Sequence, residues 1–183
     1  MADTVIFIDG EYARKIFINT GYKLNIPKLI DMILGKAAIH KDSLLRTYLY
    51  TSPPFQAENP TPEEKLRYQG FQKFKDYLDR QDSLEVRLGR TEKRGPTVFT
   101  QKMVDVLLSI DLVELSAKSK INVAILLAGD SDFVPAIQKA KNNGAKVILF
   151  CSQKKEEYHL NLWKVSDVRI HIDEAFMKKC CNK

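Results

Sequence analysis

Four aspartates are the side chains through which this chain could catalyse a reaction. Asp9 directly follows one apolar run, and Asp130 and Asp132 follow another. Asp105 interrupts a third apolar run. The first two runs have the composition of central strands in a parallel sheet, and ligands of open α/β sheets bind beyond the carboxyl ends of such strands. We therefore expect these carboxylates to converge in one crevice.

A group of carboxylates is unstable unless something offsets its charge. Two like charges about 4 Å apart repel by roughly 4 kcal/mol at an effective dielectric of about 20. Either some protons stay bound or a divalent cation neutralises the group. Oxygen ligands favour Mg²⁺ or Mn²⁺ over Zn²⁺, and no metal-ligand spacing includes the histidines, His40, His159 and His171. Such an ion can orient and deprotonate a water and stabilise the in-line displacement of a phosphodiester.

Two of these aspartates also have an interpretation as turn or capping residues. Asp132 is well placed to cap a helix that begins at Phe133, a role that is compatible with metal binding. The pair Asp9-Gly10 can form a simple turn, with Glu11 as an acid in the first turn of the next helix. Both interpretations remain open at this stage, because no single aspartate is diagnostic.

Asp105 and Asp111 lie on one predicted helix and present different faces. Asp105 shares its face with Ser109 and Ser116, which are small and polar and can line a crevice. Its alternative role is to complement the positive N-terminal end of the helix. Asp111 lies roughly 120° around the helix from Asp105 and is interpreted as a solvated residue. Asp111 and Ser131 are accessory candidates for the site.

The formal net charge of +6 indicates an anionic partner such as nucleic acid. Basic residues crowd one short segment that also holds Glu85 and Glu92: Arg87, Arg90, Lys93, Arg94 and Lys102. We expect the last four of these basic residues to contact nucleic-acid phosphates; the alternative is a solvated loop. Four aromatic residues are interpreted as core positions rather than platforms for base stacking: Tyr48, Tyr50, Phe71 and Phe74.

The order of the predicted elements indicates an α/β fold. Strand-like runs alternate with helical ones, which is typical of a mostly parallel, doubly wound sheet with helices on both faces. Strands are predicted at Thr4–Ile8, Leu44–Tyr50, Leu84–Leu88, Ile121–Leu127, Ala145–Phe150 and Val168–Ile172. Helices are predicted after Gly10, at the C-terminus, and at Ile26–Ile39, Thr61–Arg80, Met103–Ala117 and Phe133–Asn143. The segment Gly89–Thr97, which contains Pro96, is predicted to be a mobile loop.

The whole chain of 183 residues is predicted to form one domain, with a core at about 4–150 and a C-terminal strand and helix in 151–183. No apolar stretch reaches the roughly 18 residues that a membrane span needs. The N-terminal sequence lacks the basic flank of a signal peptide. Three cysteines form neither a disulfide framework nor a CxxC metal site. We therefore expect a cytoplasmic protein with no membrane partner, and the sequence predicts no oligomeric state.

Four motifs then occur in a fixed order between residues 4 and 150. They are Phe7-Ile8-Asp9-Gly10, Leu49-Tyr50-Thr51-Ser52-Pro53-Pro54, Lys102-Met103-Val104-Asp105 followed by Asp111, and Ala128-Gly129-Asp130-Ser131-Asp132-Phe133 with Gly144 downstream. In this order they resemble the NYN domains, specifically the LabA-like branch of the PIN-like nuclease superfamily. The resemblance implies a Rossmann-like (PIN-like) fold, a Mg²⁺ or Mn²⁺ site, and the ribonuclease activity of some relatives. It also implies the family's acidic cluster at Asp9, Asp105, Asp130 and Asp132.

Two positions depart from the family pattern. Tyr12 stands where many members have asparagine, and Met103 stands where glycine often follows the lysine. We expect Tyr12 to affect substrate or metal positioning and Met103 to alter packing. The predicted function is a metal-dependent nuclease that hydrolyses phosphodiester bonds in RNA, with DNA as the other candidate substrate. The alternative, which Tyr12 favours, is a non-catalytic RNA-binding or regulatory module that keeps the NYN fold.

A phosphatase of the haloacid dehalogenase type is the third hypothesis, because Asp9 follows a strand. That chemistry needs an aspartate two residues after the nucleophile, where this chain has Glu11. It also needs an acid about four residues beyond Asp130, where Val134 stands. The sequence therefore disfavours this reaction.

Overall fold

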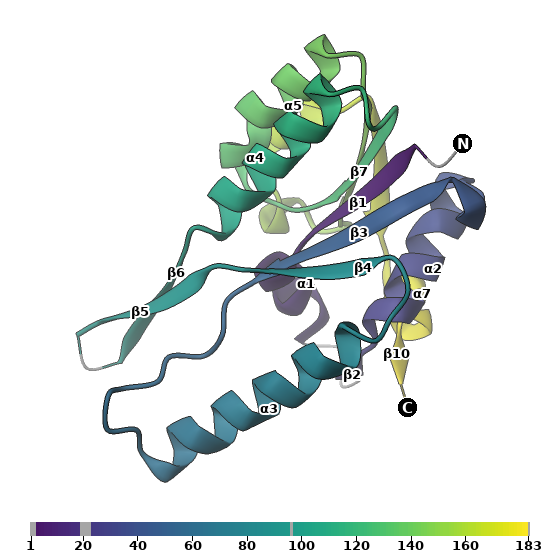
Figure 1. Cartoon of the computed structure of the whole chain (residues 1–183). Coiled ribbons are helices and arrows are strands. Elements are labelled where there is room, and N and C mark those ends of the chain that lie inside the picture. The colour runs from purple at the N-terminus through teal and green to yellow at the C-terminus, as the bar shows by residue number, and fades with distance from the viewer. Residues whose placement is uncertain (1–2, 19–22, 96, 183) are drawn as a thin grey trace.

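A computed structural model, which describes residues 3–18, 23–95 and 97–182, has a six-stranded sheet at its centre (Figure 1). Every strand pair in this sheet is parallel. The strands are β1 (Thr4–Asp9), β3 (Leu44–Thr51), β4 (Leu84–Leu88), β7 (Val123–Leu127), β8 (Lys146–Ser152) and β9 (Val168–Ile172). The predicted α/β class is confirmed, and all six predicted strands are present.

The chain reverses its direction across the sheet between β1 and β7. The strand order is β4-β3-β1-β7-β8-β9, so the chain moves outwards from β1 to β4 and then returns to the other side of β1. The pairing of β1 with β7 extends from Thr4 and Val123 to Ile8 and Leu127. The carboxyl ends of β1 and β7 therefore lie side by side at the switch point, where open α/β sheets bind their ligands.

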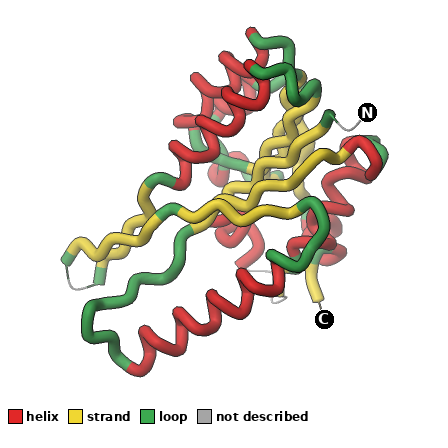
Figure 2. Tube along the Cα trace, in the orientation of Figure 1, coloured by secondary structure: helices red, strands yellow, loops and turns green. Residues whose placement is uncertain are grey.

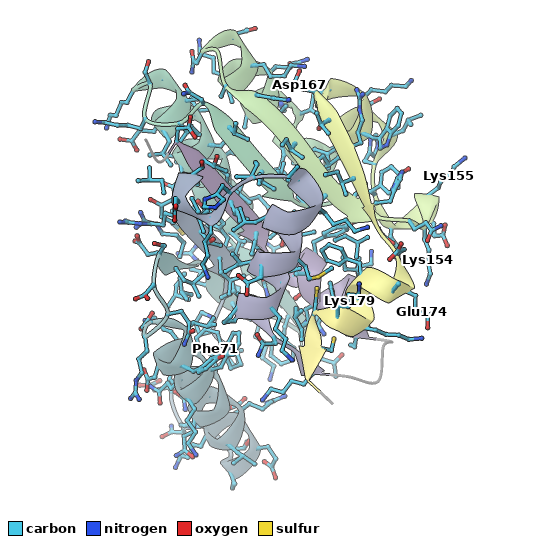
Figure 3. All side chains as sticks on the ribbon, turned by 90° about the vertical axis from the view of Figure 1, so that its right-hand side faces the viewer. Phe71, Lys154, Lys155, Asp167, Glu174 and Lys179 are labelled. Atoms are coloured by element: carbon cyan, nitrogen blue, oxygen red, sulfur yellow. The ribbon has the colours of Figure 1, made fainter. Side chains whose placement is uncertain are left out.

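Helices cover both faces of this sheet (Figure 2). One face packs against α4 (Val104–Ala117), α5 (Val134–Asn142) and α6 (Leu160–Val165). The other packs against α1 (Gly10–Phe17), α2 (Ile26–Ala37) and α7 (Glu174–Lys179). Figure 3 views this second face, with α2 in front of the sheet and α7 beside it.

Alternation along β1 decides which way its last residue points. Val5 and Phe7 belong to the core on the α4 side, whereas Ile6 and Ile8 belong to the core on the α1 side. Successive side chains of a strand point to opposite faces. Asp9 therefore points towards the side of the sheet that α4 covers.

The helix α3 (Pro62–Leu78) begins as the sequence predicts. Thr61 accepts a hydrogen bond from the Glu64 backbone N–H at 3.2 Å, and the Glu64 side chain accepts one from the Thr61 N–H at 3.2 Å. Pro62 occupies the first position, where its missing N–H costs nothing. This reciprocal capping box fixes the start of α3, which then runs back to the edge strand β4.

The prediction of a mobile loop at Gly89–Thr97 is wrong. A hairpin projects from the sheet here, in which β5 (Arg90–Arg94) pairs antiparallel with β6 (Val98–Lys102) (Figure 1). Gly95 takes a φ of 81° near the turn, and Pro96 lies outside the described residues. The charge-rich strand β5 pairs with β6, whose residues Val98, Phe99 and Thr100 have side chains that favour strands. Cross-strand pairing thus overrides the local loop signal.

Smaller elements complete the described residues. The sequence predicted neither α6 nor the two-stranded sheet of β2 (Lys23–Leu24) and β10 (Cys181–Asn182). Three short 3₁₀ turns are η2 (Lys41–Ser43), η3 (Ser131–Phe133) and η4 (Lys155–Glu157). Within residues 3–18, 23–95 and 97–182, none of the helices has the length and apolar character that crossing a membrane requires.

Met103 immediately precedes α4 in a left-handed backbone conformation, with a φ of 73°. Glycine adopts this conformation without steric cost, whereas other residues rarely do. The expected packing change is therefore not the main consequence of having methionine here: the backbone itself carries the strain.

Candidate active site at the carboxyl edge of the sheet

Asp9 ends β1 and caps α1. Its Oδ1 accepts hydrogen bonds from the backbone N–H groups of Glu11 at 3.0 Å and Tyr12 at 3.1 Å. Asp9 is only 8% exposed, and this burial raises its pKa to about 6, with further increases from the charges of Asp105 and Glu11. Asp9 therefore serves as a helix cap, with Glu11 in the first turn as predicted. The buried negative charge would be relieved by a cation.

Asp130 and Asp132 follow β7 in the turn η3. The Asp130 Oδ1 accepts hydrogen bonds from the Asp132 backbone N–H at 3.0 Å and from the Ser131 hydroxyl at 3.5 Å. The predicted cap at Asp132 is wrong, because α5 begins only at Val134, after Phe133. The intervening 3₁₀ turn makes Asp130 the capping residue and leaves the Asp132 side chain exposed.

Asp105 lies in the first turn of α4, as predicted for an acid near a helix N-terminus. Although it is exposed at the surface, partial burial raises its pKa, and the charges of Asp130 and Asp132 raise it further. The charge of Asp105 in turn raises the pKa of Asp9. Tertiary structure therefore brings Asp105 close enough to Asp9, Asp130 and Asp132 for its charge to interact with theirs.

A cavity of about 400 Å³ opens beside the ends of β1 and β7. Asp9 and Asp130 both line it, whereas Asp105 and Asp132 do not. The wall also holds three acids that the sequence analysis did not assign to the site: Glu11, Glu156 and Glu157. The sequence does contain a signal for Glu156 and Glu157, because both follow the predicted strand at β8 much as Asp130 follows β7. Lys15 and His159 lie in the same wall.

Tyr12 forms the inner wall of this cavity. Tyr12 is 6% exposed, and its hydroxyl oxygen accepts a hydrogen bond from the Ser152 backbone N–H at 3.0 Å. The ring passes so close to Gly129 that a Cβ there would lie 2.2 Å from the Tyr12 Cε2 atom. Tyr12 therefore packs across the end of β7, and Gly129 leaves the space for it.

Asp111 belongs to a separate cluster between α4 and β3. It accepts a hydrogen bond from the Tyr50 hydroxyl at 2.8 Å, and its Oδ2 lies 3.5 Å from the Arg87 Nε. Tyr50 is fully buried, so this bond satisfies a polar group in the core. The interpretation of Asp111 as a solvated residue is therefore wrong. The predicted core positions of Tyr48 and Tyr50 are confirmed.

The hairpin distributes the predicted basic residues over two faces. Arg90 pairs with Lys102, and Arg94 lies on the same face because side chains alternate. Lys93 pairs with Phe99 on the opposite face, where its Nζ lies 5.9 Å from the ring centroid of Phe99. None of these four residues lines the acidic cavity. The hairpin is thus a separate basic arm beside the site.

The donor set of the acidic cavity suits a sparsely ligated divalent ion. Among the residues that the structure describes, no three His, Cys, Asp or Glu side chains form a group that could hold a metal ion. Mg²⁺, however, is usually held by one or two carboxylates together with waters and substrate phosphates. Asp9 and Asp130 supply carboxylate oxygens to one cavity, where burial, together with the charges of Asp105 and Glu11, raises the pKa of Asp9.

The sequence matches the family model of the NYN domain over residues 3–169. The chain belongs to the NYN domain family. The parallel sheet with helices on both faces agrees with the PIN-like fold of NYN domains, which are generally nucleases. PIN-like nuclease domains typically use divalent metals and act on nucleic acid.

Two curated proteins resemble part of this NYN domain. The uncharacterized protein MJ0482 of Methanocaldococcus jannaschii is 36% identical over 73 residues, which cover 40% of this chain and 30% of that protein. The uncharacterized protein y4oD of Sinorhizobium fredii is 38% identical over 68 residues, which cover 37% of this chain and 30% of that protein. The match thus spans less than a third of the length of each relative.

Proposed function

We propose that this NYN domain hydrolyses phosphodiester bonds in RNA with Mg²⁺ or Mn²⁺. One observation carries the proposal: Asp9 and Asp130, from neighbouring central strands, line one cavity at the switch point of the sheet. Burial and neighbouring carboxylates raise the pKa of Asp9, and a cation in this cavity would stabilise its charged form. Membership of a family whose domains are generally nucleases supports the reaction class.

The residues divide into distinct roles in this proposal. Asp9 and Asp130 would hold the principal ion, and Asp105 and Asp132, which lie outside this cavity, would complete the negative surroundings of the site. The Ser131 hydroxyl donates to Asp130 and would hold its carboxylate in place. A divalent ion bound there would lower the pKa of a water and offset the charge of the phosphodiester. Asp9 also keeps its position through the two backbone N–H groups that it caps.

The basic arm would bind the phosphates on one side of the scissile bond. Arg90, Lys93 and Arg94 are exposed on the hairpin, and Lys102 is partly exposed at its base. RNA, rather than DNA, is the substrate that the resemblance to the LabA-like branch favours. Assignment to that branch rests on the motifs around Asp9, Asp105 and Asp130.

Cleavage of a labelled single-stranded RNA tests this function. We expect wild type to cleave with Mg²⁺ or Mn²⁺ and to stop when a chelator is added. Asp130→Asn should reduce the rate by about hundredfold, because it removes one of the two carboxylates that would hold the ion. Asp82→Asn is the matched control, because Asp82 is exposed at the opposite edge of the sheet, just before β4. Equal cleavage by wild type and Asp130→Asn would refute the assignment.

The position of Tyr12 favours a second function, that of a non-catalytic RNA-binding module. Its ring occupies space across the end of β7. The NYN pattern that the chain resembles has the smaller asparagine at this position. Binding of RNA without cleavage under any metal condition would support this function. Tyr12→Asn would then separate the two functions further, because a gain of cleavage in this variant would show that only the ring prevents the reaction.

A further inference from the structure

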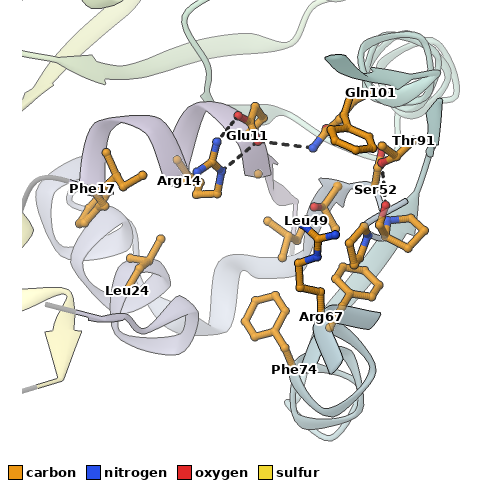
Figure 4. A pocket seen from close by; sticks show the side chains of 18 of the residues that line it. Glu11, Arg14, Phe17, Leu24, Leu49, Ser52, Arg67, Phe74, Thr91 and Gln101 are labelled. Carbon is orange, nitrogen blue, oxygen red and sulfur yellow. Dashed lines mark hydrogen bonds and ion pairs between the residues drawn. The ribbon is translucent and has the colours of Figure 1, made fainter. Parts of the chain in front are cut away.

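A second and larger cavity, of about 940 Å³, adjoins the acidic one (Figure 4). It lies among α1, α3, the segment that follows β3, and the β5–β6 hairpin. Glu11 lines both cavities, and its carboxylate also pairs with Arg14 at 2.6 Å and accepts a hydrogen bond from Gln101 at 3.4 Å. A bound chain could therefore pass from one cavity to the other along Glu11.

Several phenylalanine rings contribute to the wall of this larger cavity. Phe55, Phe71, Phe74 and Phe99 line it, and none of them is fully buried. The ring centroids of Phe55 and Phe99 are 5.7 Å apart, and Phe99 is 46% exposed. The predicted core position is confirmed for Phe74, which packs against the core on the α1 side, and it is wrong for Phe71, which is half-buried and faces the cavity. Accessible rings of this kind are the usual platforms for stacking bases of single strands.

Cationic groups accompany these rings. Arg14 and Arg67 line the cavity, and Figure 4 shows Arg67 reaching from α3 towards Leu49. The Lys93 Nζ lies 5.9 Å from the ring centroids of both Phe55 and Phe99. Apolar ring faces beside positive charges match a nucleotide, which combines a flat base with a phosphate. The volume also falls in the range of about 300–1,000 Å³ that is usual for small-ligand pockets.

We infer that this aromatic cavity binds the base of an unpaired nucleotide in the strand whose backbone enters the acidic cavity. The inference rests on the proposed function for the presence of a nucleic-acid strand. The charge complementarity of Arg67 with phosphate favours this occupant over an apolar peptide. Because a paired and stacked base cannot enter a pocket, the enzyme selects single strands or flipped nucleotides over duplexes.

The test measures binding rather than cleavage. Fluorescently labelled single-stranded oligonucleotides, as RNA and as DNA, carry one abasic position that is moved along the strand, and anisotropy is recorded in the presence of a chelator. Phe99→Ala should weaken binding of the intact strand about five- to tenfold, as expected for the loss of one stacking ring. It should not weaken binding of the strand whose abasic position matches the cavity. Phe99→Trp should keep the wild-type affinity.

Tyr77→Ala is the matched control for this experiment. Tyr77 is an aromatic residue with a similar exposure of 45%, and it does not line the cavity. We expect its removal to leave the affinity for every strand unchanged. The circular dichroism spectra of both alanine variants should match that of wild type.

Three binding results would overturn the base-binding site: an unchanged affinity in Phe99→Ala, an equal weakening for intact and abasic strands, and a lack of binding by wild type. Dimers that form in wild type and disappear in Phe99→Asp would mean that a second copy covers the cavity, and would also overturn it. Failure of the proposed function is distinguishable, because it appears as equal cleavage by wild type and Asp130→Asn while base-dependent binding persists.

Discussion

The hydroxyl oxygen of Tyr12 accepts a hydrogen bond from the backbone N–H of Ser152, at 3.0 Å. The bond links the first turn of α1 to the last residue of β8, across the end of β7. Both residues are buried, so water cannot replace either partner. Tyr12 therefore joins three segments at the edge of the sheet where the acidic cavity lies.

Tyr12→Phe should lower the free energy of unfolding by about 1–3 kcal/mol. The substitution removes the acceptor and leaves the buried Ser152 N–H without its partner. Tyr77→Phe removes a hydroxyl from a residue that is 45% exposed, and should change stability by less than about 0.5 kcal/mol. Urea unfolding of the three proteins measures both differences. Equal stability of Tyr12→Phe and wild type would show that the bond contributes nothing.

Gly129→Ala should also destabilise the protein, by about 1–3 kcal/mol. Its new Cβ would lie 2.2 Å from the Tyr12 ring and 2.8 Å from the Glu157 carbonyl oxygen, so neither neighbour can stay in place. Gly35→Ala is the opposite case, because nothing lies within 4 Å of a Cβ there and the residue is inside α2. It should stabilise by roughly 0.5–1 kcal/mol. Thermal unfolding that shows the same sign for both substitutions would contradict this packing.

Asp9→Asn should stabilise the metal-free protein at neutral pH. The rise in the pKa of Asp9 from 3.8 to about 6 corresponds to a cost of roughly 3 kcal/mol for its charged form. Asparagine keeps an oxygen for the α1 cap but carries no charge, so we expect a gain of about 1–3 kcal/mol.

The pH dependence of this gain has a definite sign. Above the folded pKa of about 6, Asp9 is ionised in the folded protein and the full cost applies. As the pH falls towards 3.8, protonation removes the cost, and the advantage of Asp9→Asn should disappear. Urea unfolding near neutral pH and at about pH 4 checks this, with Asp82→Asn as the exposed control. A gain that is constant with pH would show that the charge of Asp9 is not its cause.

Substitution of Asp111 should mainly lower the free energy of unfolding of the protein. Asp111→Ala removes the acceptor of the buried Tyr50 hydroxyl and an ionic partner of Arg87, and should cost about 2–3 kcal/mol. Tyr50→Phe with Asp111→Ala completes a double-mutant cycle, and its coupling energy should be about 1 kcal/mol or more. A coupling near zero would mean that the Tyr50–Asp111 bond is not formed in solution.

The basic arm should control how RNA binding depends on salt. Replacing Arg90, Arg94 and Lys102 with alanine should weaken binding and reduce the slope of log affinity against log salt by roughly two to three, one for each lost phosphate contact. The matched set replaces Lys36, Lys41 and Lys146, which are not on the hairpin and line neither cavity, and should leave most of that slope in place. Equal slopes for the arm variant and wild type would exclude these residues from phosphate binding.

Much of the fold follows from local patterns in the sequence. The six parallel strands occupy apolar runs bounded by turn residues, and α3 begins at a threonine that is followed by proline and two acids. The strong apolar character of the first and fourth of these strands also predicted that both are central, so that their ends could meet. The 3₁₀ turn η3 was not predicted. It shifts the start of α5 to Val134, so Asp132 does not cap this helix.

The sequence alone identified the aspartates, because each stands at a recognisable place in an apolar run or helix. Only the tertiary structure decided which of them share a cavity: Asp9 and Asp130 line it, and Asp111 instead pairs with Tyr50. Tertiary structure also decided that Glu157 joins the acidic wall and that Phe99 and Phe71 face a second cavity. The physical reason is that burial, repulsion and ring exposure depend on which distant segments pack together, whereas strand and helix signals depend on neighbours in the chain.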